Sequence, residues 1–175
     1  MPIRRLAATA LLWAGVAAST TAQAQTRPCL TDGEAEALFQ VLLPDMVSEM
    51  GRVCATLPPS AFLRRPNPAF AARLQSGVTP ALPAARSGIA KLLGPQMHGL
   101  AESQFVIPAL KVLIVPVAAQ QIEANDCPKL DKIVANLAPL PPRNLAGVFV
   151  GLAQLNADRQ KSGPRLPLCP MPRPK

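Results

Sequence analysis

The feature that most constrains the fold is an apolar stripe that begins after Cys29 and runs past Cys54. Apolar residues recur there at spacings of three and four, as on one face of an α-helix: Ala35, Leu38, Phe39, Leu42, Met46, Met50, Val53 and Leu57. The stripe keeps its phase across Pro44, so the sequence predicts one helix kinked at this proline rather than a hairpin. Such a helix would separate Cys29 from Cys54 by about 37 Å, whereas a disulfide requires Cα atoms about 4.4–6.8 Å apart. These two cysteines should therefore not pair with each other.

The start of this helix is marked by a capping box. Thr31 and Glu34 have the spacing at which the threonine hydroxyl accepts the Glu34 amide and the Glu34 carboxylate accepts the Thr31 amide. We therefore interpret the acidic residues at this end as capping groups and not as parts of an active site.

The first 24 residues have the pattern of a secretory signal peptide. Two arginines at positions 4 and 5 precede a short apolar run, and Ala22-Gln23-Ala24 matches an A-x-A cleavage site. The apolar run is shorter than the ~20 residues of a membrane span. We expect cleavage between Ala24 and Gln25, a periplasmic or secreted location, and no transmembrane segment in the mature chain.

All four cysteines lie after this signal, and an even number in an exported protein indicates two disulfides. Helices joined by short connectors run antiparallel, which places Cys54 near Cys127 and leaves Cys169 for Cys29. Four cysteines allow three connectivities, and Cys54–Cys127 with Cys29–Cys169 is the one that we favour.

Proline and glycine divide the mature chain into a helical domain, residues 25–159, and a proline-rich tail, residues 160–175. Asn67-Pro68 and Thr79-Pro80 each resemble a helix start, so two helices are predicted, one ending near Ser76-Gly77 and the other at Gly94-Pro95. Further helices are predicted after Asn125-Asp126-Cys127-Pro128 and from Asn144 to Ala157. The sequence predicts an all-α bundle of about five helices with proline kinks.

The stretch from Phe105 to Ala119 is the most apolar part of the mature chain. We predict a helix buried on most sides, with a strand at residues 112–115 as the alternative because β-branched residues gather there. The helix is preferred because no second strong strand candidate could pair with it. The stretch is too short to span a membrane and it contains Lys111.

The chain is basic, with a net charge of +8, and loss of Arg4 and Arg5 with the signal leaves 16 basic against 10 acidic residues. No acid lies between Met50 and Ala101. Five basic residues of that stretch are candidate contacts for an anionic lipid head group or cell-wall polymer: Arg64, Arg65, Arg73, Arg86 and Lys91. The alternative is that they form an ordinary solvated surface. Nucleic acid is not expected, because the chain is exported and only 3% aromatic.

Residue types that carry catalysis are scarce. His98 is the only histidine, and no Gly-x-Ser-x-Gly, Cys-x-x-Cys or His-Glu-x-x-His motif is present, so we nominate no catalytic, metal or cofactor residue. Asp45 and Glu49 lie four apart on one predicted helix face, with Arg52 as the expected partner of Glu49. A glycosidase-like acid pair is conceivable there, but the aromatic platforms that usually hold sugars are missing.

The order of several short stretches carries a resemblance to a known group. The stretches are Cys29-Leu30-Thr31, Glu34-Ala35-Glu36-Ala37-Leu38, Leu43-Pro44-Asp45, Cys54, Leu57-Pro58, Asp126-Cys127-Pro128 and Leu140-Pro141-Pro142-Arg143-Asn144-Leu145. In this order they resemble small exported proteins, periplasmic in location, of sphingomonad-type alphaproteobacteria. The resemblance implies export and a helical fold. No activity is attached to that group, so the resemblance transfers no functional residue.

Three hypotheses about function follow from the sequence. The first is a non-enzymatic structural or binding protein of the bacterial cell envelope that works through an apolar groove or a basic face. The second is an accessory or inhibitor protein that engages another periplasmic protein through its tail. The third, a hydrolase with an unrecognised site, is disfavoured by the scarcity of histidine, tyrosine and paired acids.

Overall fold

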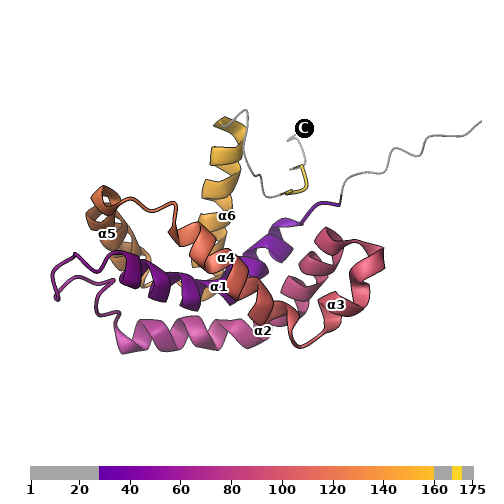
Figure 1. The fold of residues 1–175 in the computed structure, drawn as a ribbon, viewed down its shortest axis with the longest axis horizontal. Coiled ribbons are helices and arrows are strands. Elements are labelled where there is room, and N and C mark those ends of the chain that lie inside the picture. The colour runs from indigo at the N-terminus through magenta and orange to yellow at the C-terminus, as the bar shows by residue number, and fades with distance from the viewer. Residues whose placement is uncertain (1–27, 160–166, 171–175) are drawn as a thin grey trace, which may run out of the picture.

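Helix α1 (Asp32–Val53) is the element against which most of the other helices pack (Figure 1). The computed structural model describes residues 28–159 and 167–170, so the predicted signal peptide with its cleavage site and most of the tail lie outside the described residues. The other elements, in chain order, are α2 (Pro68–Leu93), η1 (Pro95–Met97), α3 (His98–Glu102), α4 (Val106–Ala119), η2 (Ala124–Asp126), α5 (Cys127–Leu137) and α6 (Pro142–Arg159). The predicted all-α class is confirmed.

The predicted start of α1 is confirmed, because Thr31 is its N-cap and forms the capping box with Glu34. The helix continues through Pro44 as one element, as the phase of the apolar stripe predicted. It ends at Val53, before Leu57, the last residue of the apolar stripe, and Cys54 is its C-cap.

Helix α2 is continuous, so the predicted division into two helices at Ser76-Gly77 is wrong. Gly77 is buried, and a Cβ there would lie 2.7 Å from Gln40 Nε2 and 2.8 Å from Pro142 Cβ. Gln40 Nε2 also donates a hydrogen bond to the Gly77 carbonyl oxygen over 2.8 Å. Gly77 therefore permits α2 to approach α1 and α6 closely, which is a different use of glycine from ending a helix.

Two prolines inside α2, Pro80 and Pro83, do not end this helix either. Its inner face is held against α1 by the buried side chains of Ala81, Ala85 and Ile89. Packing along this face outweighs the local preference of proline for a helix start, because most helical stability in proteins comes from tertiary packing.

Both favoured disulfides are confirmed. The Cα atoms of Cys54 and Cys127 are 5.5 Å apart, and those of Cys29 and Cys169 are 4.9 Å apart. The second bond fixes a short piece of the tail beside Leu30, whose N–H donates to the Pro167 carbonyl oxygen and whose carbonyl oxygen accepts from the Cys169 N–H. This isolated parallel bridge with Leu168 is the extent of β-pairing in the described residues.

The core has two parts that meet along α1. One contains the first half of α1, the second half of α2 and the inner side of α4. The other contains the second half of α1, the first half of α2, α5 and α6, and it includes the Cys54–Cys127 disulfide. Asp131 of α5 accepts a hydrogen bond from the Leu63 N–H over 2.7 Å, so the segment between α1 and α2 is attached to the second part.

Candidate functional site

Large exposed apolar side chains gather on the outer face of α4. All the exposed residues of this helix are apolar, and Phe105 at its N-cap extends the same surface. Phe105, Val112 and Leu113 are 68%, 74% and 67% exposed. We define the outer face of α4 as Phe105, Pro108, Ala109, Val112, Leu113, Ile114 and Val117.

This face is exposed because α4 covers α1 with only one side (Figure 1). Val106, Ile107 and Val115 are buried against the core. Lys111 is the single charged residue of α4, and its Nζ lies 2.8 Å from Asp45 Oδ2 of α1. The one charge of α4 is thus used to attach the helix to α1, which leaves the outer face without any polar side chain.

The sequence prediction that this helix is buried on most sides is therefore wrong. A helix that is apolar all round is normally enclosed by neighbours or by lipid. The hydrophobic pattern of residues 105–119 could not reveal which neighbours would cover the helix, because that depends on where α5 and α6 pack. The helical state itself was predicted correctly, and the strand alternative at residues 112–115 is not observed.

The sequence from Ser103 to Ile122 contains no acid, and Glu102 and Glu123 flank it on either side. Among the described residues, no single helix has the length and hydropathy needed to cross a membrane. Pro95–Glu102 and Val106–Ala119 meet these criteria only when taken together, and they are bent by 97° at their break.

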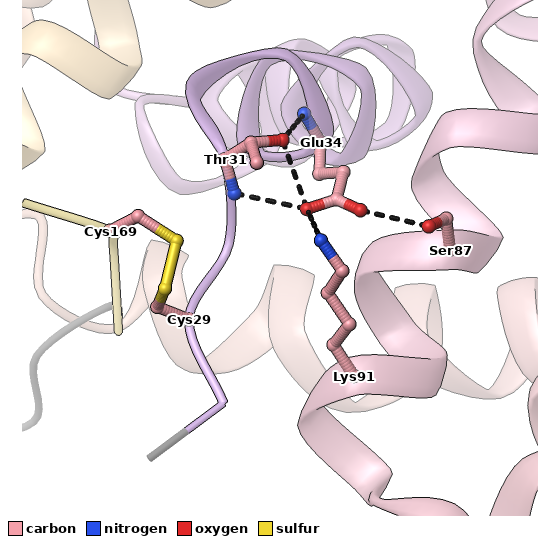
Figure 2. A network of polar contacts seen from close by, with 6 residues as sticks. All are labelled: Cys29, Thr31, Glu34, Ser87, Lys91 and Cys169. Atoms are coloured by element: carbon pink, nitrogen blue, oxygen red, sulfur yellow. Dashed lines mark hydrogen bonds and ion pairs between the residues drawn. A yellow bond between two sulfur atoms is a disulfide. The ribbon is translucent and has the colours of Figure 1, made fainter. Parts of the chain in front are cut away.

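A network of hydrogen bonds centred on Glu34 fixes the N-terminal end of α1 beside α2 (Figure 2). The Glu34 carboxylate accepts hydrogen bonds from the Thr31 amide and hydroxyl, from Ser87 Oγ over 2.8 Å and from Lys91 Nζ over 2.7 Å. Burial alone would raise the pKa of Glu34, but the bonds from Lys91, Thr31 and Ser87 outweigh it and lower the pKa to about 2. Glu34 is therefore a charged structural anchor at neutral pH.

The five basic residues predicted to contact an anion do not form one cluster. Arg64, Arg65 and Arg73 lie at or before the first turns of α2, whereas Arg86 and Lys91 lie near its end, and Arg73 and Lys91 are about 27 Å apart along the helix. Arg73 donates to the Ala138 carbonyl oxygen over 2.6 Å, and Lys91 is bound to Glu34. Contact with an extended anionic surface stays a prediction for these residues.

Arg64 lines a hollow of about 500 Å³ between α1 and α2. Its floor is formed by Val47, Leu63, Phe70 and Leu74, all of them buried core residues. Arg52 also lines this hollow, and its guanidinium is already bound to the Glu49 carboxylate.

The remaining candidates for catalysis are separated from one another. Glu49 pairs with Arg52 as predicted, and Asp45 pairs with Lys111 instead of facing Glu49 across a cleft. His98 begins α3, and its Nδ1 lies 3.7 Å from Glu102 Oε1 at the surface. Within the described residues, no group of three or more histidine, cysteine, aspartate or glutamate side chains is placed to hold a metal ion.

Comparison of the chain with known protein families, with curated proteins and with solved structures finds no match.

Proposed function

We propose that this chain is a non-enzymatic binding protein of the bacterial cell envelope, and that it docks on an anionic lipid bilayer through the outer face of α4. The observation that carries the proposal is that all the exposed side chains of α4 are apolar while its only charge is turned toward α1. Exposed apolar surfaces of this kind mark sites of contact with protein or membrane.

The chemistry of the face favours lipid over a protein partner. A protein interface typically carries about one hydrogen bond per 100–200 Å² of buried area. The outer face of α4 offers no side-chain donor or acceptor along its length. Acyl chains require none, so a bilayer satisfies this face without leaving unpaired polar groups.

The geometry favours contact in the plane of the bilayer surface. Helix α4 has 14 residues and is about 21 Å long, which is less than the ~30 Å of the hydrocarbon core. Its inner side is held by the protein core, so only the outer face can enter lipid. Interfacial helices of this kind bury their apolar face about 5–10 Å deep.

Charge supports an anionic rather than a neutral bilayer. The mature chain keeps 16 basic against 10 acidic residues after the predicted cleavage, so its net charge is positive. Basic residues near such a surface each contribute about 1 kcal/mol of attraction that salt screens. Binding should therefore weaken as the salt concentration rises.

Co-sedimentation with phosphatidylglycerol-containing vesicles tests the proposal. The double substitution Val112→Ser with Leu113→Ser removes two of the most exposed apolar side chains and should weaken binding at least about tenfold, because burial of each is worth about 1.5–3 kcal/mol. The matched control is Ile133→Ser on α5, which removes an apolar side chain that is 48% exposed on another helix. The control should bind as the unmodified chain does.

Two results would contradict the proposal. One is equal vesicle binding by the double variant and the unmodified chain. The other is no vesicle binding at low salt together with self-association that the double variant abolishes, since that result would assign the face to a second copy of the chain.

A further inference from the structure

A second feature lies away from the outer face of α4, in a cleft of about 800 Å³ between the end of α2, η1 and α3. Pro28, Pro83, Ala90 and Pro95 give it apolar walls. The polar groups of its lining are Arg86, Ser87, Lys91, His98 and Glu102. A concave site of this size with a few convergent polar groups is typical of small-molecule binding.

Arg86 is the polar residue of this cleft that the fold does not explain. Its side chain is half-buried, and its Nε is buried with no hydrogen-bond partner in the part of the chain that the structure describes. The two other basic groups of the lining have acidic neighbours, since Lys91 binds Glu34 and His98 lies beside Glu102. Among the described residues, no carboxylate lies within ion-pair distance of Arg86.

Glu34 of α1, the acid of the neighbouring network, is already occupied by other donors. The Glu34 carboxylate already accepts four hydrogen bonds, three at Oε2 and one at Oε1, as Figure 2 shows. A guanidinium donor removed from water without an acceptor is costly, and its fork of N–H groups matches a carboxylate or phosphate. Arg86 is therefore a cation of the cleft lining whose buried Nε has no acceptor among the described residues.

The charge of the cleft indicates which anion fits. Lys91 is paired with Glu34 and Glu102 lies 3.7 Å from His98, so Arg86 is the one cation of the lining that has no acid within ion-pair distance among the described residues. A singly charged carboxylate matches one guanidinium in both charge and geometry, whereas a phosphate dianion would require a second cation that is not available there. The proline and alanine walls suit an aliphatic body attached to that carboxylate.

We propose that this cleft binds a small aliphatic carboxylate, with the Arg86 guanidinium holding the carboxylate and the walls formed by Pro83, Ala90 and Pro95 contacting its hydrocarbon body. This inference does not depend on the docking of α4 on lipid, because the two surfaces share no residue. Either one can fail while the other stands.

The test is an NMR titration of the full chain with hexanoate, followed through the Arg86 Nε–Hε signal. We expect saturable binding with a dissociation constant on the order of 1 mM, as is reasonable for an eight-atom ligand. Hexyl phosphate should bind at least about fivefold more weakly than hexanoate, and hexanol and inorganic phosphate should leave the Arg86 signal unchanged.

Three variants make the titration specific. Arg86→Gln should abolish hexanoate binding, and Arg86→Lys, which keeps the charge but loses the planar fork, should weaken it at least about fivefold. Arg65→Gln, an exposed arginine outside the cleft, should bind as the unmodified chain does. Thermal denaturation adds a separate readout, because Arg86→Gln removes a donor that has no partner and should not lower the Tm of the ligand-free protein.

The inference is overturned if hexanoate shows no saturable effect on the Arg86 signal. It is also overturned if Arg86→Gln and Arg86→Lys both bind hexanoate with unchanged affinity. Tighter binding of hexyl phosphate than of hexanoate would overturn the assignment of the ligand as a monocarboxylate.

Discussion

At the scale of single residues, Glu34 joins the first turn of α1 to the last turns of α2. Its side chain is 10% exposed, and it accepts bonds both from Thr31, three residues away, and from Ser87 and Lys91, more than fifty residues away. The local half of this network follows from the spacing of Thr31 and Glu34 in the sequence. The distant half does not, because no local pattern indicates that Ser87 and Lys91 will lie beside Glu34.

Replacing this carboxylate should produce a defined change in how stability depends on pH. The pKa of Glu34 is about 2 in the folded chain against an ordinary value of 4.5, so the unfolded chain takes up the proton first as the pH falls. The stabilisation from the charged form is complete above about pH 5 and is lost between about pH 5 and pH 2. Glu34→Gln should therefore lower the free energy of unfolding by about 2–3 kcal/mol at pH 7 and by much less near pH 2.

Urea denaturation at a series of pH values checks this prediction, with Glu49→Gln as the control in an exposed pair. A constant difference between Glu34→Gln and the unmodified chain from pH 7 to pH 2 would show that Glu34 does not titrate in this way.

At the scale of elements, the sequence predicted the helices well where the signal was local. The N-terminus of α1, the helix of residues 127–137 and the helical state of α4 all follow from capping residues and apolar periodicity. The prediction failed at Gly77 and at the outer face of α4 for a common reason. In both places the outcome depends on which other helix lies alongside, and that is a property of the assembled fold.

The role of Gly77 can be tested by adding a methyl group. Gly77→Ala should destabilise the protein by about 1–2 kcal/mol, because the new Cβ would meet Gln40 Nε2 at 2.7 Å and the stiff Pro142 ring at 2.8 Å, and the gain in helix propensity offsets only part of this. Gly151→Ala in α6 is the matched control, since a Cβ there meets nothing within 4 Å. It should be neutral or stabilising by up to about 1 kcal/mol. Equal effects of the two substitutions in urea denaturation would refute the packing role of Gly77.

At the scale of the whole molecule, two disulfides link distant segments to the ends of α1. Cys54–Cys127 joins residues 73 apart in sequence, and Cys29–Cys169 joins residues 140 apart. Helix geometry alone excluded pairing of Cys29 with Cys54, and antiparallel packing favoured the observed arrangement. The exposed outer face of α4 could not be predicted in the same way, because the exposure of its side chains depends on the assembled fold.

Removal of the Cys54–Cys127 disulfide should lower the free energy of unfolding strongly. Cys54→Ala with Cys127→Ala should reduce the free energy of unfolding by about 4 kcal/mol in the chain-entropy model, since the bond closes a long loop and both residues are buried. Urea denaturation of the oxidised chain and of the double variant measures this difference. A loss below about 1 kcal/mol, or non-reducing peptide maps that join Cys29 to Cys54, would contradict the arrangement.

The central claim, that the outer face of α4 enters lipid, is tested most directly by a fluorescent reporter at Leu113. The single tryptophan, Trp13, lies in the predicted signal peptide and the chain has no tyrosine, so Leu113→Trp in the chain that begins at Gln25 provides the only indole. With anionic vesicles its emission should shift to the blue and be quenched by brominated lipids, as expected for a side chain about 5–10 Å below the surface. A tryptophan at Ile133 of α5 should stay in water under the same conditions. If Leu113→Trp shows no blue shift and no quenching while the protein remains folded, the outer face of α4 does not enter the bilayer.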